Sequence, residues 1–156
     1  MLNREYDQVC SIARTLEVLG ERWTLLVIRD VFNGHRRFDQ MQENLGVARN
    51  VLSTRLARLV DEGILEKRAY QERPPRYEYF LTEKGLDLWP VMISILHWGD
   101  RNLADDSGPP MLIRHKRCDG LVDDRGTCEK CGRRLNARDA YTEYGPGAPA
   151  EWRDAA

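Results

Sequence analysis

The chain has 156 residues, of which 42% are hydrophobic and 31% charged, and 24 Lys and Arg oppose 25 Asp and Glu. This composition argues against a disordered chain, and no apolar run approaches the roughly 20 residues that a membrane span needs. The net charge of −1 by itself argues against a nucleic-acid binder, because such proteins are often basic overall. Without an apolar secretion segment at the N-terminus, we expect a cytoplasmic protein whose four cysteines bind metal or sense redox state rather than form stable disulfides.

The chain divides at a polar stretch that ends in Gly108, Pro109 and Pro110. This composition predicts a main domain over residues 1–104, a linker over 105–112, a small extension over 113–144 and a flexible tail over 145–156. The expected fold class is mostly α with a small β-hairpin (α+β).

Helical spacing of apolar residues dominates the first sixty positions. It predicts helices over residues 12–19, 22–32 and 48–62, and a short helix that opens at Asp39 as N-cap and runs through Met41 to Asn44. In the last of these, Leu52, Leu56, Leu59 and Val60 form one stripe and polar residues the opposite face. Two helices joined by a short turn that contains Gly are typical of a helix-turn-helix.

Two β-prone segments follow, over residues 64–70 and 77–81, and they predict a hairpin whose tip carries Arg73 and Arg76. A final helix is expected to start after Thr82, its N-cap, and to continue to about Leu103, with Pro90 kinking it or dividing it in two. Its apolar residues exceed what one small core would bury and predict a homodimer interface, unless all of them pack on their own core; they are Trp89, Ile93, Leu96 and Trp98.

Several short stretches carry a resemblance to a known family. The sequence LEVLGERWTLL at residues 16–26 is similar to the second-helix signature of the HxlR-type winged helix-turn-helix regulators. Residues 37–39, 51–56, 74–79 and 81–85 are similar to the later signatures of that family and occur in the same order. The resemblance covers residues 8–104 and implies a dimeric bacterial transcription regulator, related to the MarR group, that binds double-stranded operator DNA. It makes residues 1–104 a winged helix-turn-helix domain for DNA binding and dimerisation.

The polar residues of the second helix of this motif are the candidates for DNA contact. A recognition helix enters the major groove with its N-terminal half near the base edges, where Arg and Asn can contact guanine and adenine bidentately. We expect base contacts from the first turns of the helix, by Arg49, Asn50, Ser53 and Thr54. Further along the helix, Arg55 and Arg58 are expected to contact phosphates. In the wing, Arg73 and Arg76 are expected to contact the minor groove or its backbone.

The local charge supports this interpretation over a merely solvated face. Residues 36–76 contain nine Lys and Arg against six Asp and Glu, an excess that the rest of the chain offsets. We therefore expect weak non-specific affinity for DNA, with specificity carried by a few side chains.

A second candidate site lies in the extension. His115 and Cys118 form one pair of possible ligands and Cys128 and Cys131 another, each with two residues between. One His and three Cys suit a closed, tetrahedral, structural zinc site in a zinc-ribbon-like segment. A redox pair of Cys128 and Cys131, unligated thiols, and a solvent-facing His115 remain alternatives.

The regulatory signal is less determined. Relatives that the resemblance points to often respond to electrophiles, oxidants or small aromatics, and Cys10 lies just before the first helix, where amides lower a thiol pKa. Cys10 is thus a candidate redox sensor, or else a small hydrophobe. We expect a repressor rather than an enzyme; the alternative is a small zinc-dependent enzyme or an interaction module that uses the winged helix without DNA.

Overall fold

The computed structural model describes residues 6–154, and the chain forms two compact units that divide between Leu86 and Asp87. We refer to residues 6–86 as the winged unit and to residues 87–154 as the C-terminal unit. This division lies earlier than the linker expected over residues 105–112, because the last long helix belongs with the extension. Within residues 6–154, no helix is both long and apolar enough to cross a membrane.

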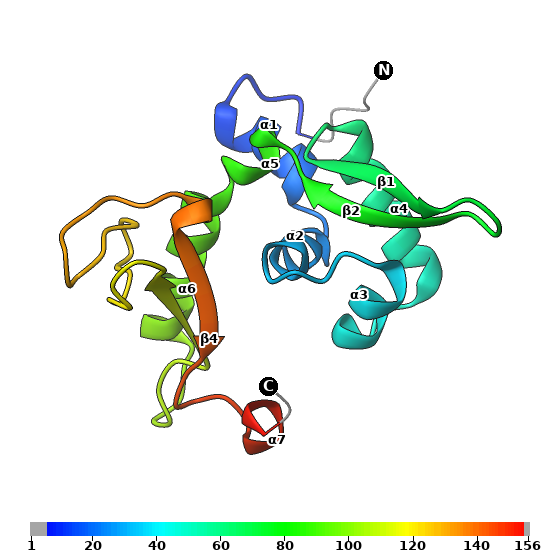
Figure 1. Cartoon of the computed structure of the whole chain (residues 1–156). Helices are drawn as coiled ribbons and strands as arrows, with labels where there is room; N and C mark the ends of the chain where they lie inside the picture. The colour runs from blue at the N-terminus through cyan, green and yellow to red at the C-terminus, as the bar shows by residue number, and fades with distance from the viewer. Residues whose placement is uncertain (1–5, 155–156) are drawn as a thin grey trace. The chain divides into compact units, whose positions relative to one another are not determined.

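Four helices form the body of the winged unit: α1 (Ser11–Leu19), α2 (Thr24–Phe32), α3 (Phe38–Leu45) and α4 (Arg49–Asp61) (Figure 1). The predicted apolar stripe of α4 faces the core, since Leu52, Leu56 and Leu59 are buried and Val60 is half-buried. They pack in one core with residues of α2, α3 and the first strand, among them Val27, Ile28, Met41 and Leu65.

The helix starts differ in detail from the sequence prediction. The structure begins α2 at Thr24 rather than at residue 22, because Trp23 has a left-handed backbone with φ of 79°. The prediction of Asp39 as N-cap is wrong: α3 begins at Phe38, and Gln40 Oε1 accepts hydrogen bonds from the backbone N–H groups that precede the helix. Asp39 instead lies in the first turn, where its charge suits the helix dipole.

The predicted hairpin is present as antiparallel strands β1 (Leu65–Gln71) and β2 (Arg76–Leu81), paired from Leu65↔Leu81 to Gln71↔Arg76. Figure 1 shows it extending past the helices to a free tip. The backbone N–H of Tyr79 donates to the carbonyl of Arg36 at 2.8 Å, which attaches the wing to the segment that precedes α3. The last predicted helix is divided in two, into α5 (Glu83–Leu86) and α6 (Trp89–Asn102), with Pro90 in the first turn of α6.

The C-terminal unit joins α6 to the cysteine-containing extension. Strands β3 (Met111–His115) and β4 (Ala140–Tyr144) pair antiparallel, and the short helices η1 (Ala137–Asp139) and α7 (Ala150–Arg153) flank β4. Trp89 and Ile93, which the sequence assigned to an exposed patch, are only 6% and 3% exposed. The Trp89 ring lies against Gly126, where an added Cβ would be 3.2 Å from it, so this face of α6 forms the core of its own unit.

The segment expected to be a flexible tail carries local structure. The backbone N–H groups of Gly145 and Gly147 donate to the carbonyls of Pro110 and Pro109, at 2.8 and 3.1 Å. The ring of Trp152 in α7 lies 6.1 Å from that of Tyr144.

Candidate nucleic-acid interface and metal cluster

The solvent face of α4 presents the four side chains that sequence analysis assigned to base contacts. Arg49, Asn50, Ser53 and Thr54 are all exposed and occupy its first two turns, opposite the buried leucines. The Thr54 hydroxyl donates to the Asn50 carbonyl at 2.9 Å, which leaves the hydroxyl lone pairs free to accept. The Asn50 amide and the Ser53 hydroxyl have no side-chain partner within residues 6–154, so both can bond to an external group.

Arg49 has a defined position at the start of the helix. Its guanidinium lies 4.8 Å from the centroid of the Phe38 ring on α3, a cation–π contact that leaves the side chain exposed. Ala48 is the N-cap and makes no side-chain cap, so the first N–H groups of α4 lack a side-chain acceptor from their N-cap.

Arg55 and Arg58, assigned to phosphates by sequence analysis, are engaged within the chain. Arg55 forms an ion pair with Glu21. Arg58 Nε lies 3.1 Å from Glu62 Oε1, and its Nη2 donates to the Glu17 carbonyl at 3.4 Å. Both side chains thus tie α4 to the rest of the winged unit and keep few N–H groups for an external phosphate.

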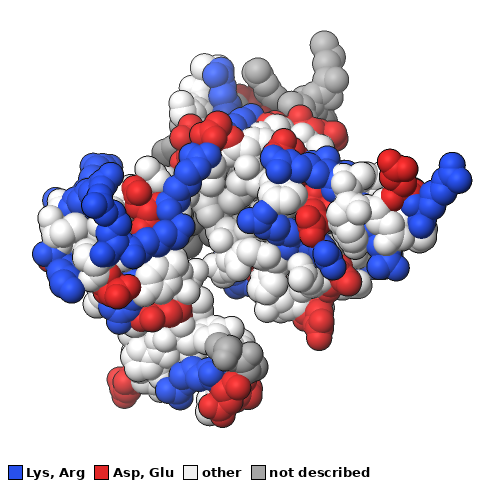
Figure 2. Space-filling view, in the orientation of Figure 1, with Lys and Arg blue, Asp and Glu red and all other residues white. Residues whose placement is uncertain are grey.

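The wing tip has the opposite character. Arg73 and Arg76 flank the turn and are exposed, and neither side chain has a partner among the described residues. Figure 2 shows basic and acidic side chains next to one another at the outer end of the hairpin. Both guanidinium groups are therefore available to an external anion.

Four further basic side chains, which sequence reasoning did not single out, stack on aromatic rings of the winged unit. A basic side chain over a ring is held in place while its charge stays exposed. The hairpin sequence does carry both basic and aromatic residues, but Arg36 and Arg37 lie outside it and meet its rings only in the fold. The contacts are Arg36 and Arg68 over Phe80 at 4.4 and 4.3 Å, Arg37 over Tyr70 at 4.4 Å, and Lys67 over Tyr77 at 4.0 Å.

Carboxylates neutralise some of these charges and not others. Arg37 pairs with Glu78 at 3.1 Å, and Arg68 pairs with Glu66. Within the described part of residues 36–76, the basic side chains without a carboxylate partner are Arg36, Arg49, Lys67, Arg73 and Arg76. The positive excess of this segment is thus carried on α4, the wing and the segment before α3.

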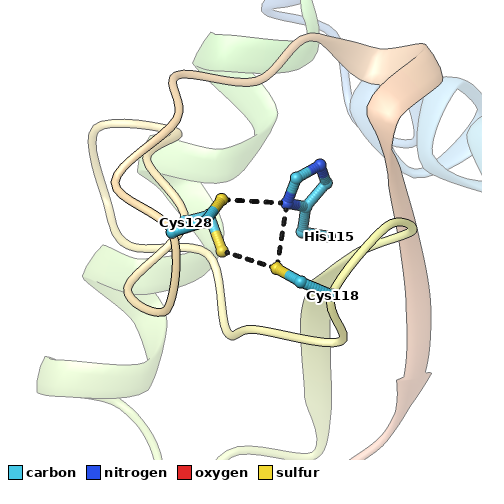
Figure 3. A group of neighbouring side chains, drawn as sticks. His115, Cys118 and Cys128 are labelled. Carbon is cyan, nitrogen blue, oxygen red and sulfur yellow. Dashed lines mark hydrogen bonds between the residues drawn. The ribbon is translucent and has the colours of Figure 1, made fainter.

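The second site brings His115, Cys118, Cys128 and Cys131 together, with their ligand atoms all within 4.8 Å of one another. Cys118 Sγ lies 3.2 Å from His115 Nδ1 and 3.4 Å from Cys128 Sγ, and Cys131 Sγ lies 3.4 Å from the same ring nitrogen. Figure 3 shows the labelled side chains converging from the end of β3 and from the loops that follow it. Zn–S bonds of about 2.3 Å place tetrahedral sulfurs roughly 3.8 Å apart, so only a small adjustment would surround an ion.

Burial and hydrogen bonding tune these thiols in opposite directions. Burial disfavours a Cys128 thiolate, but the N–H groups of Cys131 and Lys130 and the Cys118 side chain outweigh it and lower the pKa of Cys128 to about 6. For Cys118, a hydrogen bond from Gly120 favours the thiolate, yet burial and the neighbouring cysteines together raise the pKa.

Two glycines shape the cluster. A Cβ added to Gly120 would lie 2.5 Å from Cys128 Sγ, so only glycine leaves room for the sulfur there. Gly132 has φ of +71° and closes the turn after Cys131. The role of Gly120 was missed, because the contact joins segments that only the fold brings together.

Cys10 lies at the N-cap of α1 and is exposed. The backbone N–H groups of Ala13 and Ile12 stabilise the thiolate, and Arg14 adds a smaller attraction, so the pKa of Cys10 falls below that of an ordinary thiol. It is not part of the C-terminal cluster.

Two apolar stripes remain on the surface. On α6 the exposed side chains are Val91, Ile95 and Trp98, the last two 47% and 54% exposed. Of the four residues assigned to a dimer interface, Trp98 is therefore exposed and Leu96 half-buried, while Trp89 and Ile93 are not available. Before and along α1, Val9, Ile12 and Leu16 form a second exposed stripe.

Comparison with known proteins assigns the chain to a family. The family described as HxlR-like helix-turn-helix matches residues 18–107. An uncharacterized HTH-type transcriptional regulator of Mycobacterium tuberculosis is 44% identical over 141 residues, 90% of this chain and 89% of the relative. The solved structure of the candidate transcription factor PA1607 superposes with a TM-score of 0.69 at 32% identity over 85% of this chain and 93% of its own. The oxidised redox regulator HypR matches 62% of this chain and all of its own, with a TM-score of 0.56 at 29% identity. The chain therefore belongs to the HxlR-like helix-turn-helix family of transcriptional regulators.

Proposed function

We propose that this transcriptional regulator binds operator DNA with α4 in the major groove and the β1–β2 wing on the adjacent backbone or minor groove. The observation that carries the proposal is the pairing pattern of the basic side chains. Among the residues that the structure describes, those on the outward face of α4 and at the wing tip lack a carboxylate partner, whereas Arg55 and Arg58 on α4 are engaged within the chain. The unpaired groups are the ones that a duplex would meet in the helix-turn-helix docking geometry.

The experiment replaces the first turn of the reading helix. We expect Arg49→Ala with Asn50→Ala to abolish sequence preference in a gel-shift assay on the DNA upstream of the protein's own gene, with the fold intact by circular dichroism. Each lost bidentate base contact costs about 1–3 kcal/mol of discrimination. Arg14→Ala, an exposed change on α1, is the matched control. Unchanged operator affinity in the double variant would contradict this placement of α4.

We propose that the regulator acts as a homodimer. The Val91, Ile95 and Trp98 stripe and the stripe at α1 are apolar surfaces of the kind that mark interfaces. Two-fold symmetry would present two reading helices to the half-sites of a pseudo-palindromic operator. We propose that it represses transcription in the cytoplasm by occupying a promoter, because this mode of action requires no additional surface for contacting the transcription machinery.

We propose that His115, Cys118, Cys128 and Cys131 hold a structural zinc ion. A donor set of one imidazole and three sulfurs is typical of closed zinc sites, and four protein ligands leave no open position for a substrate. The ion would neutralise the thiolates and connect the β3 end to the two loops after it. Because few apolar residues of the extension are buried, metal binding would supply much of its folding free energy.

We propose Cys10 as the site at which an oxidant acts on the regulator. Its exposure, its position at a helix N-terminus and its lowered pKa all favour the thiolate, which is the form that attacks a peroxide. The similarity to the redox regulator HypR supports a response of this class.

A further inference from the structure

The loops that build the metal cluster are rich in basic residues. Residues 114–138 contain eight Lys and Arg against four Asp and Glu, a larger excess in a shorter segment than in the helix-turn-helix and wing. Figure 2 shows Lys and Arg side chains gathered over the part of the C-terminal unit where Figure 1 draws the loops between β3 and β4. The proposed function of the winged unit makes no use of this surface.

The acidic residues of these loops are mostly committed to local contacts. Asp119 accepts a hydrogen bond from the Tyr141 hydroxyl at 3.0 Å, and Asp123 accepts from the backbone N–H groups of Arg125 and Thr127 at 2.9 and 2.8 Å. Asp124 pairs with Arg101 of α6 at 3.2 Å. Of the four acidic residues within 114–138, all of which the structure describes, only Glu129 has a side chain without such a contact.

Four arginines have no partner for their guanidinium groups among residues 6–154. They are Arg117, Arg125, Arg133 and Arg134, and all four are exposed. They come from three different loops around the cluster, so a bound metal that fixes these loops would also fix the spacing of the four charges.

The chemistry of this surface favours phosphate over a protein partner. Guanidinium groups donate in a planar fork that matches phosphate oxygens. A protein interface would need an apolar centre, but within residues 114–138 the one exposed large hydrophobic side chain is Leu121. We propose that these four arginines form a second DNA-contacting surface, which binds phosphates of the duplex without reading its sequence. This inference rests on the proposed function, which supplies the DNA duplex that the arginines would contact. Its test does not require that an operator be known.

The test measures the salt dependence of DNA affinity for the full-length, zinc-loaded protein. The probes are a fluorescein-labelled 50-base-pair duplex of arbitrary sequence and one of equal length from upstream of the protein's own gene, titrated by fluorescence anisotropy from 50 to 300 mM KCl. Each phosphate contact contributes about 0.9 to the slope of log affinity against log salt. The variant with Ser at positions 117, 125, 133 and 134 is expected to lose up to about 3.6 of that slope per subunit, equally on both duplexes.

Three controls accompany it. The variant with Lys at the same four positions keeps the charges and should keep most of the slope. Arg153→Ser removes an exposed charge of α7 outside these loops and should leave the slope unchanged. Zinc content equal to that of the wild type shows that the Ser variant retains the cluster. If the variant loses zinc, the four single Arg→Ser variants are measured in its place.

The outcomes separate this inference from the proposed function. An unchanged slope in the Ser variant overturns the inference and leaves an acidic protein surface as the partner of these loops. A loss confined to the upstream duplex also overturns it, because phosphate contacts do not distinguish sequences. A slope reduced on both duplexes in the Ser variant supports the inference. If the wild type binds the two duplexes equally well, operator recognition by α4 is refuted, but the inference about the four arginines is not.

Discussion

The wing tip offers the sharpest quantitative prediction. Arg73 and Arg76 are exposed and unpaired in the described chain, so replacing both by Ala should remove two phosphate contacts per subunit and disturb no intrachain bond. Two contacts correspond to about 1.8 in the slope of log affinity against log salt concentration. When the salt concentration is doubled, the wild type should therefore lose about 3.5-fold more affinity per subunit than the variant does. For a dimer the ratio of the two losses is the square of that factor.

The assay is fluorescence anisotropy on a labelled duplex from upstream of the protein's own gene, between 50 and 300 mM KCl. Arg14→Ala, on the exposed face of α1, is the control for the loss of one positive charge outside the helix-turn-helix and wing. A double variant whose slope equals that of the wild type would refute the argument that unpaired basic side chains mark the DNA-facing surface.

The remaining predictions concern the C-terminal unit, the dimer and the sensor. Chelation, or Cys128→Ser, should release about one equivalent of zinc per chain and make residues 111–144 sensitive to protease while the winged unit stays folded; less than half an equivalent in reduced wild-type protein would contradict the site. Ile95→Asp, which introduces a charge into the apolar stripe of α6, should give a monomer in sedimentation at micromolar concentration, and an unchanged dimer would exclude this face from the interface. Because the pKa of Cys10 lies below that of an ordinary thiol, a larger fraction of it is thiolate at neutral pH, and iodoacetamide should label it there faster than an unstructured cysteine peptide. Cys10→Ser should keep DNA binding after peroxide treatment; if it loses binding as the wild type does, the sensor lies elsewhere.

The features that local sequence determines were predicted closely. The apolar period places Leu52, Leu56 and Leu59 on one side of α4, because a helix with that pattern has a single face to bury. The presence of the hairpin follows from its turn residues and β-prone flanks, whereas its register, with an irregularity between Ala69 and Gln71, was not predicted. The cluster of candidate metal ligands follows from the two-residue spacing of each pair, which brings both members to one point.

The tertiary structure decided which of several equivalent side chains are available. Trp89 and Trp98 have the same character in the sequence, but the loop at Gly126 covers one ring and leaves the other exposed. Arg55 and Arg73 are both basic residues of the helix-turn-helix and wing, but Arg55 forms an ion pair with Glu21, whereas Arg73 forms none within the described part of the chain. Such pairings join residues far apart in the chain, so neither helical period nor motif spacing contains them. The sequence by itself determined the helix-turn-helix, the wing and the His/Cys cluster, because each follows from local spacing. Only the long-range packing decided which surfaces and charges remain available to a partner.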